Sequence, residues 1–241
     1  MRLASRPLAA VALTLLGACG SITDPDGASA RRAPKPVKPT ILFVHGWNAN
    51  ASTWNTMVGR FRKDGWQTSQ LVTFSYNTAA SNSITAGIIK SKVDSILSAG
   101  SATQVSIVTH SMGALSARYY TRNLGGDARV AAVVTLGGTN HGTQTAIFCF
   151  QTSCQEMIPG SSFLTALNAT DETWGAPRYG TWWSPCDEVI NPDDSALLSG
   201  GATNTQTACM SHSQLHENAT VYTQVRDFVN QPTAATFIAS R

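Results

Sequence analysis

Residues 104–113 read Gln-Val-Ser-Ile-Val-Thr-His-Ser-Met-Gly, and this stretch decides the fold. Residues 104–109 form an apolar run of strand length, and residues 111–124 are typical of a helix. A serine between a buried strand and a helix is the context of a nucleophile elbow, a sharp turn that projects the Ser111 hydroxyl out of the sheet. The usual pattern is Gly-x-Ser-x-Gly, and Thr109 stands in place of the first glycine. An ordinary strand–helix turn is the alternative interpretation.

Apolar runs of strand length recur on both sides of this stretch and alternate with segments of helical spacing. We expect strands at 40–46, 70–76, 104–109, 129–136, 178–183 and 203–209, and helices at 81–99, 111–124 and 217–230. The alternation predicts the α/β class, with a mostly parallel central sheet flanked by helices. Residues 139–177 are the least regular part of the chain.

A serine hydroxyl is a weak nucleophile and needs a base. The chain has five histidines, and in this fold the order along the chain is serine, acid, histidine. His212 lies between the last expected strand and the last expected helix, so we predict that it is the base. His216 is the alternative, four residues further on. His141 comes too early to leave room for the acid, and we expect it in a loop near the cleft.

The acid must orient the imidazole and stabilise its cationic form. Asp187 follows the expected strand 178–183, and the end of a strand is where such an acid belongs. We therefore predict Asp187 as the acid. Glu188 and the pair Asp193-Asp194 are more typical of solvated loop charges.

An oxyanion hole needs two backbone N–H groups aimed at the developing charge. One is normally that of the residue after the nucleophile, which is Met112. The other comes from the loop after the first strand, and there we predict Trp47. We expect His45 to brace this loop. Several tryptophans fit either an acyl pocket or the core: Trp47, Trp54, Trp182 and Trp183.

Cysteine usage indicates an oxidising compartment. Of five cysteines, Cys19 falls in the N-terminal segment, and the other four allow three pairings. We expect Cys149–Cys154, which closes a short loop, and Cys186–Cys209, which ties the Asp187 segment to the His212 segment. A zinc site is the rival interpretation, but no Cys-x2-Cys spacing supports it.

The N-terminus is typical of an export signal. Basic residues precede the apolar run 8–16, which is too short to span a bilayer permanently. Leu16-Gly-Ala-Cys19 resembles the lipobox of bacterial lipoproteins, which predicts lipidation of Cys19 and membrane anchoring through it. An ordinary secretory signal, with Ala28-Ser-Ala30 as a cleavage site, is the alternative. We therefore expect a signal peptide at 1–19, a Pro-rich tether at 20–39 and a single catalytic domain at 40–241, located outside the cytoplasm.

Composition excludes two classes of protein. Hydrophobic residues make up 42% of the 241 residues, which is too many for a disordered chain. The formal net charge is only +3, so no basic face for nucleic acid is expected. We expect a monomer.

With these motifs, the chain resembles the bacterial class 2 triacylglycerol lipases, which are small secreted α/β-hydrolases. The resemblance covers residues 40–230 and rests on these segments: Phe43-Val-His-Gly46, Val108–Gly113, Val134–Gly138 with Asn140-His-Gly142, the Asp187 segment, and Ser211–Leu215. Lipases of this kind carry another residue, usually Ala, at the first elbow glycine, and Thr109 is a variation on that.

The resemblance implies hydrolysis of carboxylic esters of lipids through Ser111, Asp187 and His212 and an acyl-enzyme, with no metal or cofactor needed. Acyl chain length stays open, as does whether residues 143–177 form a lid or a pocket wall. The alternatives are a short-chain esterase or polyesterase, an acyltransferase, and a surface lipoprotein that binds apolar ligands without catalysis.

Overall fold

The computed structural model describes residues 38–100 and 102–231. The expected signal peptide 1–19, its Cys19 and nearly all of the expected tether 20–39 lie outside the described residues. Over the described ranges, no helix is both long enough and apolar enough to cross a membrane.

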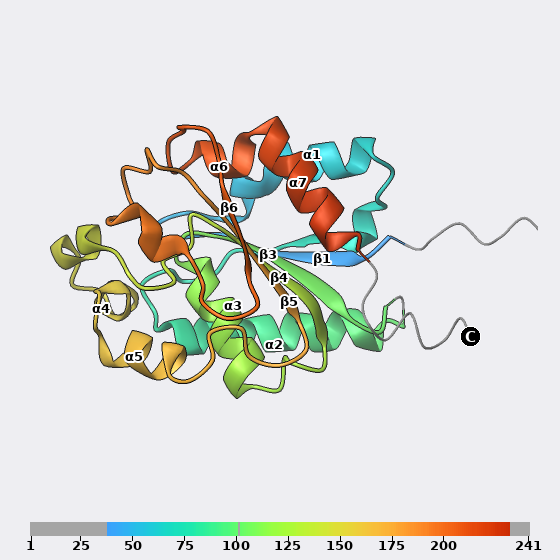
Figure 1. The fold of residues 1–241 in the computed structure, drawn as a ribbon. Coiled ribbons are helices and arrows are strands. Elements are labelled where there is room, and N and C mark those ends of the chain that lie inside the picture. Colours follow the sequence, from blue (N-terminus) through green and yellow to red (C-terminus); the bar gives the residue numbers. More distant parts are fainter. Residues whose placement is uncertain (1–37, 101, 232–241) are drawn as a thin grey trace, which may run out of the picture. The chain divides into compact units, whose positions relative to one another are not determined.

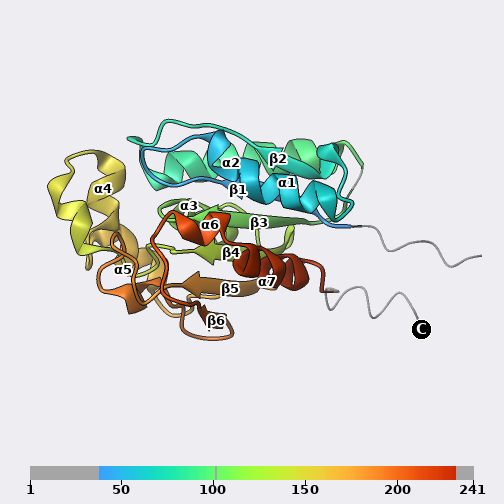
Figure 2. The same cartoon turned by 90° about the horizontal axis from the view of Figure 1, so that it is seen from above.

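Six parallel strands form one sheet in the order β2-β1-β3-β4-β5-β6 (Figure 2). The strands are β1 (Thr40–Val44), β2 (Leu71–Thr73), β3 (Val105–His110), β4 (Val130–Leu136), β5 (Arg178–Trp183) and β6 (Thr203–Gln206). The strand order changes direction between β1 and β3, and in open sheets of this kind ligands bind beyond the carboxyl ends of the strands at such a point. The predicted α/β class and parallel sheet are confirmed.

In the part of the chain that the structure describes, seven α-helices accompany the sheet. They are α1 (Asn55–Lys63), α2 (Asn82–Ser98), α3 (Gly113–Asn123), α4 (Thr152–Met157), α5 (Ser162–Asn168), α6 (Gln214–Glu217) and α7 (Ala219–Val229). Helices α2 and α3 cover one face of the sheet, and α1 and α7 cover the other (Figures 1 and 2). Short 3-10 helices occur in the connections: η1 (Ala51–Trp54), η2 (Thr68–Gln70), η3 (Gln144–Phe148) and η4 (Asp193–Ala196).

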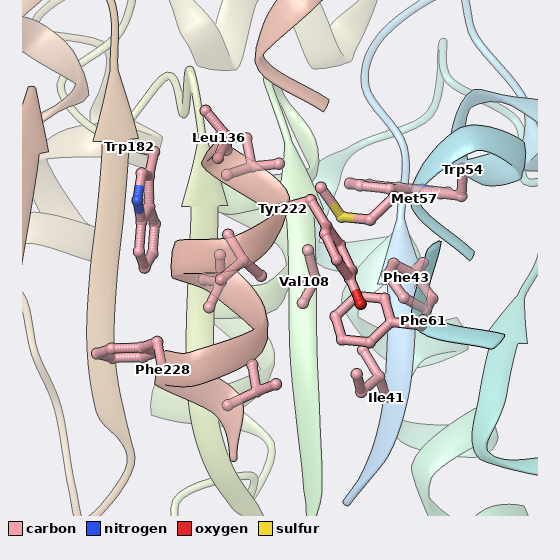
Figure 3. Close-up of a cluster of buried hydrophobic side chains, with 14 of the residues drawn as sticks. Ile41, Phe43, Trp54, Met57, Phe61, Val108, Leu136, Trp182, Tyr222 and Phe228 are labelled. Carbon is pink, nitrogen blue, oxygen red and sulfur yellow. The ribbon is translucent and has the colours of Figure 1, made fainter. Parts of the chain in front are cut away.

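Strand β1 is buried on both faces because it lies between these two helical layers. Ile41 and Phe43 belong to the cluster under α1 and α7, whereas Leu42 and Val44 belong to the cluster under α2 and α3. In the first cluster, Phe43 and Phe61 pack with ring centroids 6.0 Å apart (Figure 3). Such full burial explains why the strand is continuously apolar rather than alternating.

The structure differs from the sequence expectations mainly in short elements. Strand β2 has three residues instead of the seven expected at 70–76. Helix α1 was not predicted, although its two buried residues, Met57 and Phe61, stand one helical turn apart on the same face. The expected helix 217–230 is α7, which begins at Ala219 because the Asn218 side chain accepts hydrogen bonds from its first turn. Glu217 belongs to the preceding short helix α6.

Candidate active site

Ser111 stands in the turn between β3 and α3 with a φ of +56°, a left-handed conformation that a residue with a side chain rarely adopts. Its N–H donates to the carbonyl oxygen of Leu136 in β4 at 2.9 Å. Two glycines allow the close packing around it. A Cβ on Gly46 would lie 2.7 Å from the Cβ of Ser111, and one on Gly113 would lie 2.7 Å from the carbonyl oxygen of Val44. The strained turn that the motif predicts is therefore present.

Thr109 occupies the position where the usual motif has glycine. Its side chain is completely buried, and its hydroxyl donates to the carbonyl oxygen of Val134 in β4 at 2.9 Å. A buried hydroxyl without a partner would destabilise the fold. The neighbouring strand thus accommodates a residue larger than glycine at this position.

A cavity of about 520 Å³ lies beyond the carboxyl ends of the central strands, beside Ser111. Residues that directly follow β1, β3 and β4 line it, among them Trp47, Ser111 and Thr139. A second wall comes from the irregular stretch of the sequence: Thr143, Thr145, Ala146, Phe148, Cys149, Cys154 and Met157. Element η3 and helix α4 therefore serve as a pocket wall, and the cavity is large enough for a small-molecule ligand.

Asp187 and His212 are both buried and lie together. Nδ1 of His212 donates to Oδ2 of Asp187 at 2.8 Å, while Oδ1 of Asp187 accepts from the N–H groups of Val189 at 2.9 Å and Ile190 at 3.0 Å. Gly137, with a φ of +52°, makes room for the pair, because a Cβ there would lie 2.9 Å from Oδ2 of Asp187 and 3.0 Å from Nδ1 of His212. This bond fixes the tautomer of His212 that leaves Nε2 free to accept a proton.

His212 and Ser111 line the same cavity. In the described part of the chain, which includes both residues, no hydrogen bond joins the Ser111 hydroxyl to the His212 ring. Contacts between a base and a nucleophile are often long without substrate and close when it binds.

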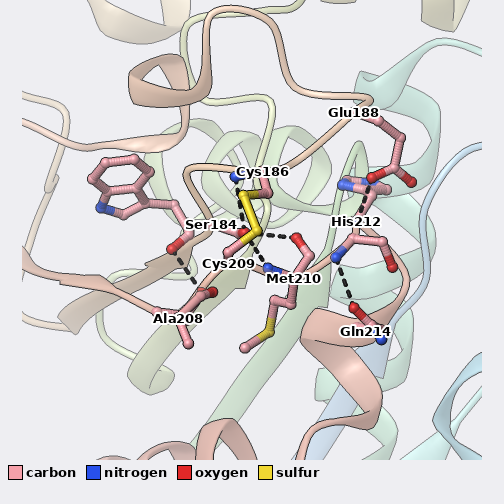
Figure 4. The surroundings of a disulfide bond; sticks show 11 residues. Ser184, Cys186, Glu188, Ala208, Cys209, Met210, His212 and Gln214 are labelled. Carbon is pink, nitrogen blue, oxygen red and sulfur yellow. Dashed lines mark hydrogen bonds between the residues drawn. A yellow bond between two sulfur atoms is a disulfide. The ribbon is translucent and has the colours of Figure 1, made fainter.

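Ser184 and a disulfide join the segment that carries Asp187 to the segment that carries His212 (Figure 4). The hydroxyl of Ser184 donates to the carbonyl oxygen of Met210 at 2.6 Å and accepts from the N–H of Met210 at 2.9 Å. Cys186 and Cys209 are bonded, with Cα atoms 5.1 Å apart. No local sequence pattern pointed to Ser184, because its partner Met210 lies 26 residues away.

Glu188 corrects one expectation. The sequence suggested a solvated loop charge, and the side chain is indeed exposed, but its Oε2 accepts the N–H of His212 at 3.0 Å (Figure 4). The carboxylate thereby holds the main chain of His212, whereas the neighbouring Asp187 holds its ring. Asp194, by contrast, is exposed at the start of η4.

Three histidine rings cluster around the site. The ring centroid of His110 lies 4.4 Å from that of His212 and 4.7 Å from that of His216. Burial, and then the nearby His212, lowers the pKa of His110 well below its ordinary value, and burial also lowers the pKa of His216. His141 is not among the residues that line the cavity, and its Nε2 instead pairs with Glu172 at 2.7 Å. His141 thus lies in a loop between two cavity-lining residues, Thr139 and Thr143, but does not itself line the cavity.

The backbone N–H groups of Trp47, which lines the cavity with Ser111, and of Met112, the residue after Ser111, are among those that donate no hydrogen bond within the described part of the chain. The indole of Trp47 donates to Oε1 of Gln151 at 2.7 Å, which links this loop to the second wall of the cavity. Below the loop, His45 is buried, donates from Nδ1 to the carbonyl oxygen of Gly46 at 2.9 Å and stacks on Tyr76. His45 thus braces the loop.

The structure separates the candidate tryptophans. Trp47 lines the cavity, whereas Trp54 packs against Phe43 and Trp182 against Phe228 in the core. Trp183 is half-buried and is not among the cavity-lining residues.

Both expected disulfides are present. Cys149 and Cys154 are bonded, with Cα atoms 5.6 Å apart. Cys186 and Cys209 are bonded as well, with Cα atoms 5.1 Å apart. The rival zinc interpretation of these cysteines is therefore wrong. Among residues 38–100 and 102–231, no group of three or more His, Cys, Asp or Glu side chains is arranged to hold a metal.

The family model of class 2 lipases matches residues 38–232. A lipase of Bacillus licheniformis in its mature form superposes with a TM-score of 0.72 at 17% identity, covering 82% of this chain and 94% of that one. Lipase B of Aspergillus fumigatus gives 0.69 at 16% identity over 81% of this chain and 53% of that one. A phospholipase of Legionella pneumophila gives 0.66 at 13% identity, over 85% and 62%.

Proposed function

The chain belongs to the class 2 lipase family and is a carboxylic ester hydrolase, and from that premise we propose that Ser111, Asp187 and His212 form its catalytic triad. The observation that carries the proposal is the buried hydrogen bond between Asp187 and His212 at the wall of the cavity that holds Ser111. A ligand-binding protein has no need of a serine in a strained turn facing such a pair. The substrate class is esters of lipids.

In the proposed mechanism, the oxygen of Ser111 attacks the ester carbonyl while Nε2 of His212 takes its proton. The N–H groups of Trp47 and Met112 stabilise the oxyanion. His212 then gives its proton to the departing alcohol, which leaves an acyl-enzyme on Ser111. Water enters, loses a proton to His212 and attacks the acyl carbonyl, and the fatty acid is released with Ser111 restored. Asp187 stays ionised and holds the imidazole in place throughout.

We also propose that the protein works outside the cytoplasm, as a secreted enzyme or one anchored through Cys19. The two disulfides support this location, because disulfides persist in oxidising compartments. Residues 40–241 would then form one catalytic domain behind a removed signal peptide and a tether.

The test is hydrolysis of p-nitrophenyl esters from two to sixteen carbons, together with emulsified triacylglycerol, by the full chain and by its Ser111→Ala variant. We expect hydrolysis by the wild type and a loss of turnover on the order of 10⁶ in the variant. A preference for ten or more carbons identifies a lipase, and activity confined to two to four carbons identifies a short-chain esterase or polyesterase. Equal inactivity of both proteins on every ester would refute the triad.

A further inference from the structure

Several contacts hold His212 to the segment that carries the proposed acid (Figure 4). They are hydrogen bonds to the ring and the N–H of His212, hydrogen bonds to Met210 and a disulfide at Cys209. On the acid segment they come from Ser184, Cys186, Asp187 and Glu188. None of these four residues belongs to β3 or to the turn that carries Ser111. The proposed acid and base therefore form one unit, and the proposed nucleophile belongs to another.

One further side chain connects the two units. His110 directly precedes Ser111, and its Nε2 lies 3.1 Å from the carbonyl oxygen of His212. A carbonyl oxygen can only accept, so Nε2 of His110 carries the proton and donates the hydrogen bond. In the part of the chain that the structure describes, no other hydrogen bond joins residues 209–216 to residues 105–113.

His110 is itself fixed by the sheet. It is the last residue of β3, where it is in register with Leu136 of β4, and it is buried. Its ring also packs against that of His212, with centroids 4.4 Å apart. A side chain carried on a strand positions its partner more precisely than one carried on a loop. His212, between β6 and α6, lies in a loop and gains such a fixed partner in His110.

The His110 ring can remain beside the base during the reaction because it is neutral. Burial, and then the nearby His212, lowers the pKa of His110 well below its ordinary value. A second positive charge so close would oppose the imidazolium that His212 becomes when it accepts a proton. A neutral imidazole with its proton on Nε2 still donates to the carbonyl oxygen of His212. The contact therefore persists while the charge of His212 changes.

We propose that His110 is a positioning residue that keeps Nε2 of His212 within reach of the Ser111 hydroxyl. It acts through the main chain of His212 rather than on the substrate. This inference rests on the proposed function and adds to it the residue that connects the nucleophile to the acid and base. Proton transfer needs a separation of about 2.6–3.2 Å, and a displacement near 1 Å costs about 10²-fold in rate.

Two substitutions separate the donor of His110 from its ring. His110→Phe keeps a flat ring beside His212 and removes the donor, whereas His110→Gln keeps an N–H donor of similar reach and removes the ring. On p-nitrophenyl butyrate, we expect kcat to fall about tenfold to a hundredfold in His110→Phe, with KM unchanged within about threefold. His110→Gln should keep kcat within about threefold of the wild type.

Tyr222→Phe is the matched control, because it also keeps a ring and removes one hydrogen-bond donor. The Tyr222 hydroxyl donates to Oδ2 of Asp64 at 2.7 Å, and neither residue lines the cavity. Denaturant unfolding measures the loss of stability in both variants. Only His110→Phe should also lose turnover. If His110→Phe does not fold, His110→Asn takes its place with the same expectation, because its amide is too short to reach the carbonyl oxygen of His212.

A thiol at position 111 tests the proposal without ester hydrolysis. In a Ser111→Cys chain, a nearby His212 favours the thiolate, which is the form that iodoacetamide alkylates. Mass spectrometry of the peptide that contains residue 111 gives the rate for this thiol alone. At about pH 6 we expect alkylation to slow about tenfold when His110→Phe is added and to recover with His110→Gln.

Unchanged kcat and unchanged alkylation in His110→Phe would overturn the proposal. An equal loss in His110→Phe and His110→Gln would do so as well, because the ring and not the donor would then matter. An equal loss of kcat in Tyr222→Phe would reduce the effect to stability. If the wild type hydrolyses no ester but His110→Phe slows alkylation about tenfold, the proposed function fails while the positioning of His212 by His110 stands.

Discussion

The hydroxyl of Ser184 binds both main-chain polar groups of Met210. It accepts from the N–H of Met210 at 2.9 Å and donates to the carbonyl oxygen of Met210 at 2.6 Å. Met210 comes two residues before His212, and Ser184 comes three before Asp187. One buried hydroxyl therefore sets the distance between the two segments that carry the acid and the base. The bond between Asp187 and His212 depends on that distance.

Ser184→Ala should lower both stability and turnover. The change leaves the N–H and the carbonyl oxygen of Met210 without their partner, and a buried unpaired polar group destabilises by about 1–3 kcal/mol. Denaturant unfolding measures the first effect and kcat on p-nitrophenyl butyrate the second. A variant with wild-type unfolding and wild-type kcat would show that the disulfide alone maintains the geometry.

Removing the disulfide next to the acid should have a larger effect than removing the other one. Cys186→Ser with Cys209→Ser opens a connection of 23 residues, and Cys149→Ser with Cys154→Ser opens one of 5. Loop-closure entropy predicts about 3 kcal/mol of lost stability for the first pair and about 2 kcal/mol for the second. The first pair should also lower kcat on a soluble ester more than the second pair does, because Cys149 and Cys154 line the cavity but do not join the segments of Asp187 and His212. Calorimetry and ester kinetics on both double variants test this, and equal kcat in the two would contradict it.

Gly137→Ala should reduce turnover far more than it reduces stability. The new Cβ would lie about 3 Å from both Asp187 and His212 and push them apart, and a displacement near 1 Å costs about 10²-fold in rate. Gly125→Ala is the control, because Gly125 also has a positive φ but no atom within 4 Å of its Cβ position. The two variants should lose similar stability in denaturant while only Gly137→Ala loses activity. Similar kcat in both would show that the pair tolerates the displacement.

His212→Ala should abolish turnover, whereas His216→Ala should leave most of it. Nδ1 of His212 has the Asp187 partner, and Nδ1 of His216 is buried without any hydrogen bond. A base without an orienting acid does not hold the required tautomer. Steady-state rates on p-nitrophenyl butyrate distinguish the two, and the reverse result would make His216 the base.

Stability should fall as the pH drops below about 6.5. The pKa values of His110 and His216 are lowered in the folded protein, chiefly by burial. Below the ordinary value, the unfolded chain therefore binds protons that the folded chain does not, and each such group contributes a slope of up to about 1.4 kcal/mol per pH unit. Denaturant unfolding between pH 5 and 7 measures the slope. His216→Gln should flatten it, and an unchanged slope would mean that His216 gains no protons on unfolding in this range.

The sheet and the elbow were predictable because their signals are local. Each buried parallel strand is a short apolar run in one piece of the chain, and Ser111 lies directly between such a run and a helix. Asp187 and His212 were identified by their position after strands, and the structure brings them together at 2.8 Å. Trp54 and Trp47 could not be told apart, because a tryptophan in the core and one at a cavity have the same local sequence pattern.

Contacts between distant segments left no such signal. Glu188 and Ser184 act on main-chain groups of His212 and Met210, and any side chain of suitable length at the right place in the fold could do so. Helix α1 is a different case, because Met57 and Phe61 stand one helical turn apart and the sequence therefore carried its signal. Only the packed structure reveals the contacts of Ser184 and Glu188.

The ribosome makes Ser111 before it makes the two other residues of the proposed triad. Ser111 leaves the ribosome about a hundred residues before His212, which at ordinary rates of synthesis is roughly 5–20 seconds. During that interval the nascent chain carries the proposed nucleophile without its proposed base, and until residue 187 is made it also lacks the proposed acid. A chain that ends before residue 187 therefore contains only one member of the proposed triad and cannot form the crosslink beside Asp187.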